Sequence, residues 1–164
     1  IVNAANGKGP MGRGVAGAIG FAGGPELRND VRRTCEARKR ASGQYGYVEG
    51  ECYISSSGDL SKNGIEKVYH AVTMEYPGGR TSVDICSKAM RTTLDTAIAN
   101  GIKSIAFPAL GTGVGGLNKQ QVASAMVSIA QSYGDRIDVT LVDIDDDFIE
   151  YASERVQVEK AEEL

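Results

Sequence analysis

Two short glycine-rich stretches have the spacing of a loop that binds phosphate groups. Both GRGVAG, residues 12–17, and GTGVGG, residues 111–116, fit the pattern G-x-G-x-x-G. Glycine permits positive φ and a close approach of the main chain, so successive N–H groups can point at an anion. A single match means little in a chain with 21 glycines among 164 residues, so the context of each stretch decides its meaning.

The first stretch lacks the context of an NAD(P)-dependent oxidoreductase. A dinucleotide-binding loop begins directly after its strand, and an acidic residue about 20 positions further on binds the ribose. Here residues 4–11 separate Gly12 from the strand expected to end at Asn3, and the later segment CEARKR is basic. An NAD(P)-dependent oxidoreductase therefore remains only the weaker alternative.

The rest of the chain alternates between short apolar segments and longer amphipathic ones. Strands are expected at residues 1–3, 45–55, 66–72, 103–110 and 138–142, and helices at 15–21, 25–40, 81–100, from 118 and from about 146. This alternation predicts an α/β fold, a three-layer α/β/α sandwich with a mixed, largely parallel sheet. Because parallel strands end at one edge of a sheet, the two glycine loops are expected to line one crevice, where they suit a diphosphate.

The segments that carry these loops resemble the macro domain, a family of ADP-ribose-binding modules. The resemblance rests on IVNAAN (residues 1–6), MGRGVAGAI (11–19), VYHAV (68–72) and SIAFPALGTGVGGL (104–117), in this order and spacing. It implies one domain over residues 1–157, without the family's first strands, and an acidic tail over 158–164. It also implies binding of ADP-ribose or a derivative, without a cofactor. Hydrolysis of mono-ADP-ribosyl or O-acetyl-ADP-ribose linkages and non-catalytic reading of ADP-ribosylated proteins are the two functions left open.

The resemblance assigns roles to individual residues. Asn6 is expected to hydrogen-bond the distal ribose hydroxyls, because its amide offers both a donor and an acceptor, whereas Asn3 supports the loop from within. Two diphosphate loops and one aromatic residue complete the ligand-binding set: Gly12, Arg13, Gly14, Val15, Gly111, Thr112, Gly113, Val114, Gly115 and Phe148. Arg13 stands where the family commonly has glycine, and it either reaches a phosphate or projects into solvent. Phe148 either packs on the adenine or belongs to the core.

Departures from the family pattern bear on catalysis and on base recognition. Ala16 occupies the position at which many hydrolytic members carry an aspartate, so no catalytic residue is assigned. Gly115 replaces an aromatic residue and leaves the distal ribose more open. The acidic residue that holds the adenine amino group in the family precedes NAAN, so Asp143, Ile144 and Asp145 are the candidates that replace it here.

The remaining chemically versatile residues have plainer explanations. His70 is the only histidine and is expected to be a packed strand residue. The basic segment of residues 28–40 contains interspersed acids, and the net charge is −3, which argues against a nucleic-acid partner. The acids at 145–147 are expected to begin a helix rather than to bind metal. Three widely spaced cysteines are expected to be reduced thiols. No membrane or signal segment is seen, and a cytoplasmic protein is expected.

Overall fold

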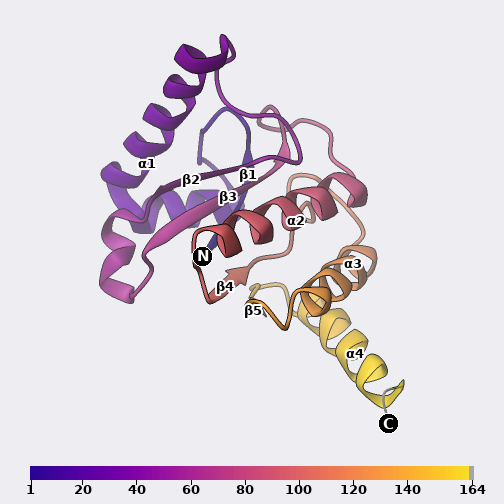
Figure 1. Ribbon diagram of the computed structural model, residues 1–164. Helices are drawn as coiled ribbons and strands as arrows, with labels where there is room; N and C mark the ends of the chain where they lie inside the picture. Colours follow the sequence, from indigo (N-terminus) through magenta and orange to yellow (C-terminus); the bar gives the residue numbers. More distant parts are fainter. Residues whose placement is uncertain (163–164) are drawn as a thin grey trace.

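The computed structural model describes the backbone of residues 1–162 and the side chains of residues 1–156 (Figure 1). Its elements follow in the order β1 (Val2–Asn6), α1 (Gly14–Ser42), β2 (Cys52–Ser56), the 3-10 helix η1 (Gly58–Asn63), β3 (Lys67–Met74), α2 (Val83–Ala99), β4 (Ser104–Phe107), α3 (Lys119–Ser132), β5 (Asp138–Leu141) and α4 (Asp146–Glu162). No helix in the described part of the chain is both long enough and apolar enough to span a bilayer.

The strands form a mixed arrangement at the centre of the molecule. β1 pairs in parallel with β3, β2 pairs antiparallel with β3, and β4 pairs in parallel with β5. Hydrogen bonds thus join β2, β3 and β1 into one sheet and β4 and β5 into a second, and β1 lies next to β4, so the strands follow one another in the order β2-β3-β1-β4-β5. The predicted mixed, largely parallel sheet is therefore confirmed.

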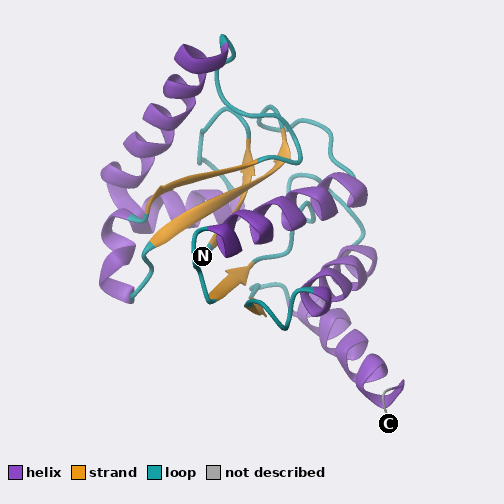
Figure 2. Cartoon of the chain, in the orientation of Figure 1, coloured by secondary structure: helices purple, strands orange, loops and turns teal. Residues whose placement is uncertain are grey.

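Helices cover both faces of the strands (Figure 2). On β3 the buried side chains alternate between two apolar clusters, because successive residues of a strand point to opposite faces. Val68 and Val72 pack under α1, whereas Tyr69 and Ala71 belong to the larger cluster that includes α2 and α3 residues. These three layers are the α/β/α sandwich that the sequence predicts.

Several element boundaries differ from the prediction. β1 runs to Asn6 rather than ending at Asn3, and β4 ends at Phe107 rather than at Leu110. Residues 45–51 form a loop rather than the start of a strand, because Gly46 and Gly50 adopt φ of 78° and 87°, which interrupts an extended chain. The two helices expected around residues 15–40 are the two halves of α1, separated by a kink at Gly24 with φ 76° and ψ −170°. The helix α4 extends to Glu162, into the expected acidic tail, and residues 163–164 lie outside the described residues.

Candidate functional site

The side chain of Asn6 closes the loop that follows β1. Its Oδ1 accepts the N–H groups of Lys8 and Gly9, each at 2.9 Å, and its Nδ2 donates to the carbonyl of Pro10 at 2.9 Å. Both lone pairs of Oδ1 and one of two amide protons are thus used within the loop. Asn6 is expected to offer a ribose diol both a donor and an acceptor. In the structure only one N–H of its Nδ2 is left to bind a ligand.

The next residue, Gly7, runs through a narrow slot between two other segments. Its N–H points at the carbonyls of Met74 and Glu75, both at 2.9 Å, and its own carbonyl accepts the N–H of Tyr47 at 2.8 Å. A Cβ at this position would collide with the Tyr47 carbonyl. The segment around Tyr47, where the sequence predicts a strand, therefore packs against this loop.

The first glycine loop is open toward solvent. Arg13 is the N-cap of α1 with extended backbone, and Gly14 begins the helix with φ of 56°. A Cβ at Gly12 or Gly14 would meet nothing within 4 Å, and Val15 is half-buried. The first N–H groups of a helix lack partners within it and carry the positive end of its dipole. The main-chain N–H groups of residues 12–15 can therefore donate hydrogen bonds to an anion. The side chain of Arg13, in the same loop, is exposed.

The second glycine loop is tightly folded. The N–H of Gly116 donates to the carbonyl of Gly113, and that of Leu117 donates to the carbonyl of Gly111, both at 3.0 Å. A Cβ at Gly111, where φ is 77°, would lie 2.7 Å from the Sγ of Cys86. At Gly115 a Cβ would lie 2.6 Å from the Cγ2 of Thr81. The backbone of this loop therefore accepts only glycine at both positions without rearrangement, and an aromatic residue at 115 does not fit this geometry.

Within this loop the remaining predicted residues differ in exposure. Gly113 and Val114 are exposed, with Val114 at 58%, while Thr112 is half-buried. A Cβ at Gly113 would meet nothing within 4 Å. The tip of the loop thus faces open space, as the tip of the first loop does.

The segment between β3 and α2 touches the loop that follows β1 and the second glycine loop. At its start the Oε1 of Glu75 lies 3.6 Å from the Nζ of Lys8, and that ammonium is 4.9 Å from the centre of the Tyr76 ring. At its end Thr81 lies against Gly115. The loops that follow β1, β3 and β4 run to the same end of the sheet (Figure 2). The segments that carry the two predicted loops therefore start from the same end of the sheet (Figure 2).

A buried polar chain runs under α1, beside the predicted site. The Nδ2 of Asn3 lies 3.1 Å from the Nδ1 of His70, and the Nε2 of His70 lies 2.8 Å from the Oγ of Ser55. With the amide donating, the imidazole carries its proton on Nε2 and donates to Ser55, whose hydroxyl donates to the carbonyl of Ser56 at 3.0 Å. The Oδ1 of Asn3 is buried without a hydrogen-bond partner among the described residues.

This environment decides the role of His70. The side chain is 0% exposed. Burial lowers its pKa from 6.5 to about 3, with the charge of Asp30 acting weakly in the opposite direction. A general base must reach the proton that it removes, and no path from solvent reaches this ring. The expected structural roles of His70 and Asn3 agree with these contacts.

The region after β5 decides between the two positions expected for Phe148 and removes this residue from the predicted ligand-binding set. Phe148 is 0% exposed and belongs to the main apolar cluster, so it is not available to stack on an adenine. The helical period of α4 turns its ring inward, which its proximity to the strand end did not reveal.

The acidic residues just before α4, Asp143 and Asp145, accept hydrogen bonds from main-chain N–H groups. The Oδ2 of Asp143 accepts the N–H of Ala109 at 3.0 Å. Asp145 caps α4 by accepting the N–H of Phe148 at 3.1 Å, and its Oδ2 lies 2.6 Å from the Nζ of Lys119. The hydrogen bond from Lys119 and that from the Phe148 N–H keep the pKa of Asp145 below its ordinary value. Ile144 between them is 100% exposed.

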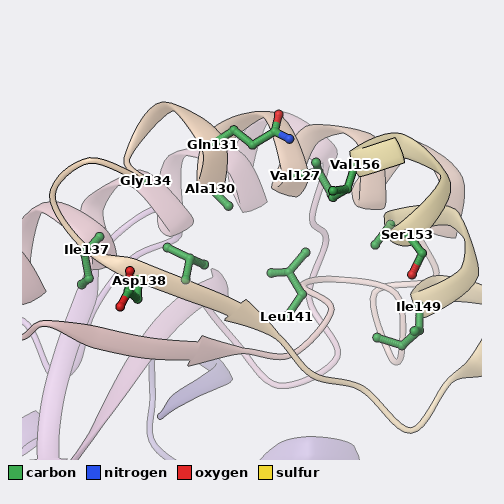
Figure 3. A pocket seen from close by; sticks show the side chains of 12 residues that line it. Val127, Ala130, Gln131, Gly134, Ile137, Asp138, Leu141, Ile149, Ser153 and Val156 are labelled. Carbon is green, nitrogen blue, oxygen red and sulfur yellow. The ribbon is translucent and has the colours of Figure 1, made fainter. Parts of the chain in front are cut away.

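A hollow of about 650 Å³ lies elsewhere, between β5, α3 and α4 (Figure 3). Its lining is mainly aliphatic, including Val127, Leu141, Ile149 and Val156, and its only charged side chain is Asp138. Within the described residues 1–156 no glycine loop borders it and no cationic side chain lines it, so this part of the chain offers a diphosphate no positive partner there. Among the described residues no group of three His, Cys, Asp or Glu side chains is placed to hold a metal ion.

The sequence and the fold both have known counterparts. The sequence profile of the Macro domain matches residues 2–126. A protein from Aquifex aeolicus is 37% identical over 152 residues, covering 92% of this chain and 84% of the relative. An O-acetyl-ADP-ribose deacetylase from Enterobacter cloacae is 39% identical over 135 residues, covering 81% and 69%. A variant of the Oceanobacillus iheyensis macrodomain, solved with ADPR, superposes with a TM-score of 0.78 at 25% identity, covering 96% and 83%.

Proposed function

Because the chain belongs to the macro domain family, we propose that it binds ADP-ribose or a derivative between its two glycine loops. The observation that carries the proposal is that the segment from Glu75 to Thr81 contacts the loop after β1 at Lys8 and the second glycine loop at Gly115. The structural neighbour solved with ADPR supports the choice of ligand.

The main-chain N–H groups at the start of α1 and in the second glycine loop are the proposed diphosphate ligands. Both regions present backbone at glycines with open space before them, at Gly12, Gly14 and Gly113. Arg13 is exposed and forms no ion pair with another described residue, so its guanidinium is free to contact a phosphate when the ligand binds. The free amide proton of Asn6 is the proposed donor to the distal ribose.

We propose hydrolysis of O-acetyl-ADP-ribose as the reaction, because a relative at 39% identity is an O-acetyl-ADP-ribose deacetylase. Water adds to the acyl carbon of the ester, the bond from that carbon to the ribose oxygen breaks, and acetate and ADP-ribose are released. Ala16 supplies no carboxylate to activate the water, so positioning and main-chain donors have to provide the acceleration. The same absence favours the second candidate, a reader that binds without turnover.

Calorimetric titration with ADP-ribose, NAD, ADP and AMP tests the binding proposal. Clear preference for ADP-ribose supports it, whereas absent binding overturns it, and equal affinity for NAD favours an oxidoreductase. Acetate release from O-acetyl-ADP-ribose then separates the two candidate functions. Turnover above the buffer rate supports the hydrolase, and binding without turnover supports the reader.

Replacing Asn6 by aspartate is expected to lower the affinity for ADP-ribose by about tenfold or more, because the proposed hydrogen bond to the distal ribose is lost. The substitution Asn6→Asp retains an oxygen that accepts the Lys8 and Gly9 N–H groups, but it removes both the proposed ribose donor and the hydrogen bond to the Pro10 carbonyl. Titration with ADP, which lacks the distal ribose, is the control. Unchanged affinity for ADP-ribose, or an equal loss for ADP, would contradict the proposed ribose contact.

A further inference from the structure

The carbonyl of Asn6 is bonded to a residue outside the predicted site. The pairing of β1 with β3 changes register between Ala5 and Asn6. At this shift the Asn6 carbonyl accepts a hydrogen bond from the hydroxyl of Tyr53 at 3.1 Å. Tyr53 lies on β2, on the far side of β3 from β1, so its side chain spans the middle strand to reach the loop.

Both ends of the peptide group between Asn6 and Gly7 are thereby fixed. Tyr53 binds the carbonyl, and the N–H of Gly7 points at the carbonyls of Met74 and Glu75, both at 2.9 Å. Because a peptide group is planar, two anchors on opposite sides set the orientation of the whole plane. That plane determines where the Asn6 backbone turns, and hence where its amide is presented.

The ring of Tyr53 is itself held in place. It is 3% exposed and stacks on His70 with centroids 4.5 Å apart, and on Tyr47 with centroids 4.7 Å apart. The guanidinium of Arg38 lies 4.5 Å from the centre of the Tyr47 ring. Stacked rings of this kind favour one geometry. Burial also raises the pKa of Tyr53, so its hydroxyl retains the proton that it donates.

We propose that Tyr53 is a positioning residue for the distal-ribose subsite, acting through the Asn6 carbonyl rather than through the ligand. The inference rests on the proposed function for its effect on binding. Its structural part, the ordering of residues 6–9, is independent of any ligand. The stacked rings of Tyr47, Tyr53 and His70 then connect the apolar layer under α1 to the loop that carries Asn6.

The substitution Tyr53→Phe removes the hydroxyl and keeps the stacked ring. Tyr69→Phe is a matched control, because Tyr69 is also 3% exposed and its hydroxyl also takes part in one hydrogen bond, from the Nδ2 of Asn100 at 3.1 Å. We expect Tyr53→Phe to weaken ADP-ribose binding about three- to tenfold while leaving ADP binding unchanged. Tyr69→Phe is expected to change neither. Equal affinity of Tyr53→Phe and the unsubstituted protein for ADP-ribose, or an equal loss for ADP, overturns the proposal.

Amide hydrogen exchange of the ligand-free protein separates this inference from the proposed function. Faster exchange of the Gly7, Lys8 and Gly9 amides in Tyr53→Phe, but not in Tyr69→Phe, supports the inference that Tyr53 orders the loop that carries Asn6. Unchanged exchange at these amides overturns it. Failure of the unsubstituted protein to bind ADP-ribose overturns the proposed function instead, whatever the exchange shows.

Discussion

Replacing Gly7 by alanine is expected to lower the free energy of unfolding by about 3 kcal/mol, the upper end of the usual cost of overpacking. The added Cβ would collide with the carbonyl of Tyr47, and it would lie 3.1 Å from the carbonyl of Glu75. Both obstacles are backbone atoms, which cannot rotate away as a side chain can. The loop can relieve the clash only by breaking the hydrogen bonds on either side of Gly7, so loss of ADP-ribose binding is expected as well. Urea denaturation gives the stability change.

The substitution Gly12→Ala is the control for this prediction. Gly12 lies in the same loop region, but a Cβ there meets nothing within 4 Å and its φ is not positive. It is therefore expected to change the free energy of unfolding by less than about 0.5 kcal/mol, as exposed substitutions usually do. Equal free energies of unfolding for Gly7→Ala and Gly12→Ala would contradict the close contact of Gly7 with the carbonyls of Tyr47 and Glu75.

Acidification from pH 6.5 to pH 5 is expected to lower the free energy of unfolding by about 2 kcal/mol through His70 alone. The pKa of the buried ring is lowered from 6.5 to about 3. Between these values the unfolded chain takes up a proton that the folded protein excludes, so stability falls as the pH falls through 6.5. The slope approaches about 1.4 kcal/mol per pH unit. Urea midpoints measured between pH 7 and pH 5 test it.

The single histidine makes this prediction easy to isolate. In His70→Gln, which keeps polar groups but does not titrate, the slope between pH 6.5 and 5 is expected to disappear, even if the variant is less stable at pH 7. The imidazole resonances of the folded protein are expected to stay at their neutral positions down to about pH 4. Stability that is flat over this range, or a resonance that titrates near 6.5, would show that the ring is accessible to water.

Local patterns in the sequence were sufficient for most elements. Asn118 accepts the N–H of Gln121 at 3.0 Å as the cap of α3, and Ser82 accepts that of Ile85 at 3.1 Å as the cap of α2. Such capping depends on residues three positions apart, so it is visible along the chain. The spacing of apolar residues likewise separated strands from helices. The predicted start of β2 was wrong, because Tyr47 stacks on Tyr53 and its N–H binds the carbonyl of Gly7, so this segment crosses a distant loop rather than extending a strand.

Motif spacing predicted the two glycine loops, but not how they are built. That Gly111 and Gly115 pack against Cys86 and Thr81 depends on how α2 lies over the loop, a contact between segments far apart in the chain. The burial of Phe148 depends in the same way on the rotation of α4 about its axis. Its position in the sequence allows the Phe148 ring to lie near the predicted crevice, but in the folded protein the ring is buried in the core.

Taken alone, the sequence determined the fold class and the family, because these depend on periodicity and on short motifs in a fixed order, and the same motifs predict where the candidate site lies. The tertiary structure decided how each group is used. Most of the donors and acceptors of the Asn6 side chain are bonded within its own loop, and its carbonyl is bonded to Tyr53. Burial keeps His70 neutral. Hydrogen bonds, burial and pKa depend on which distant residues meet in space, and no local pattern encodes those meetings.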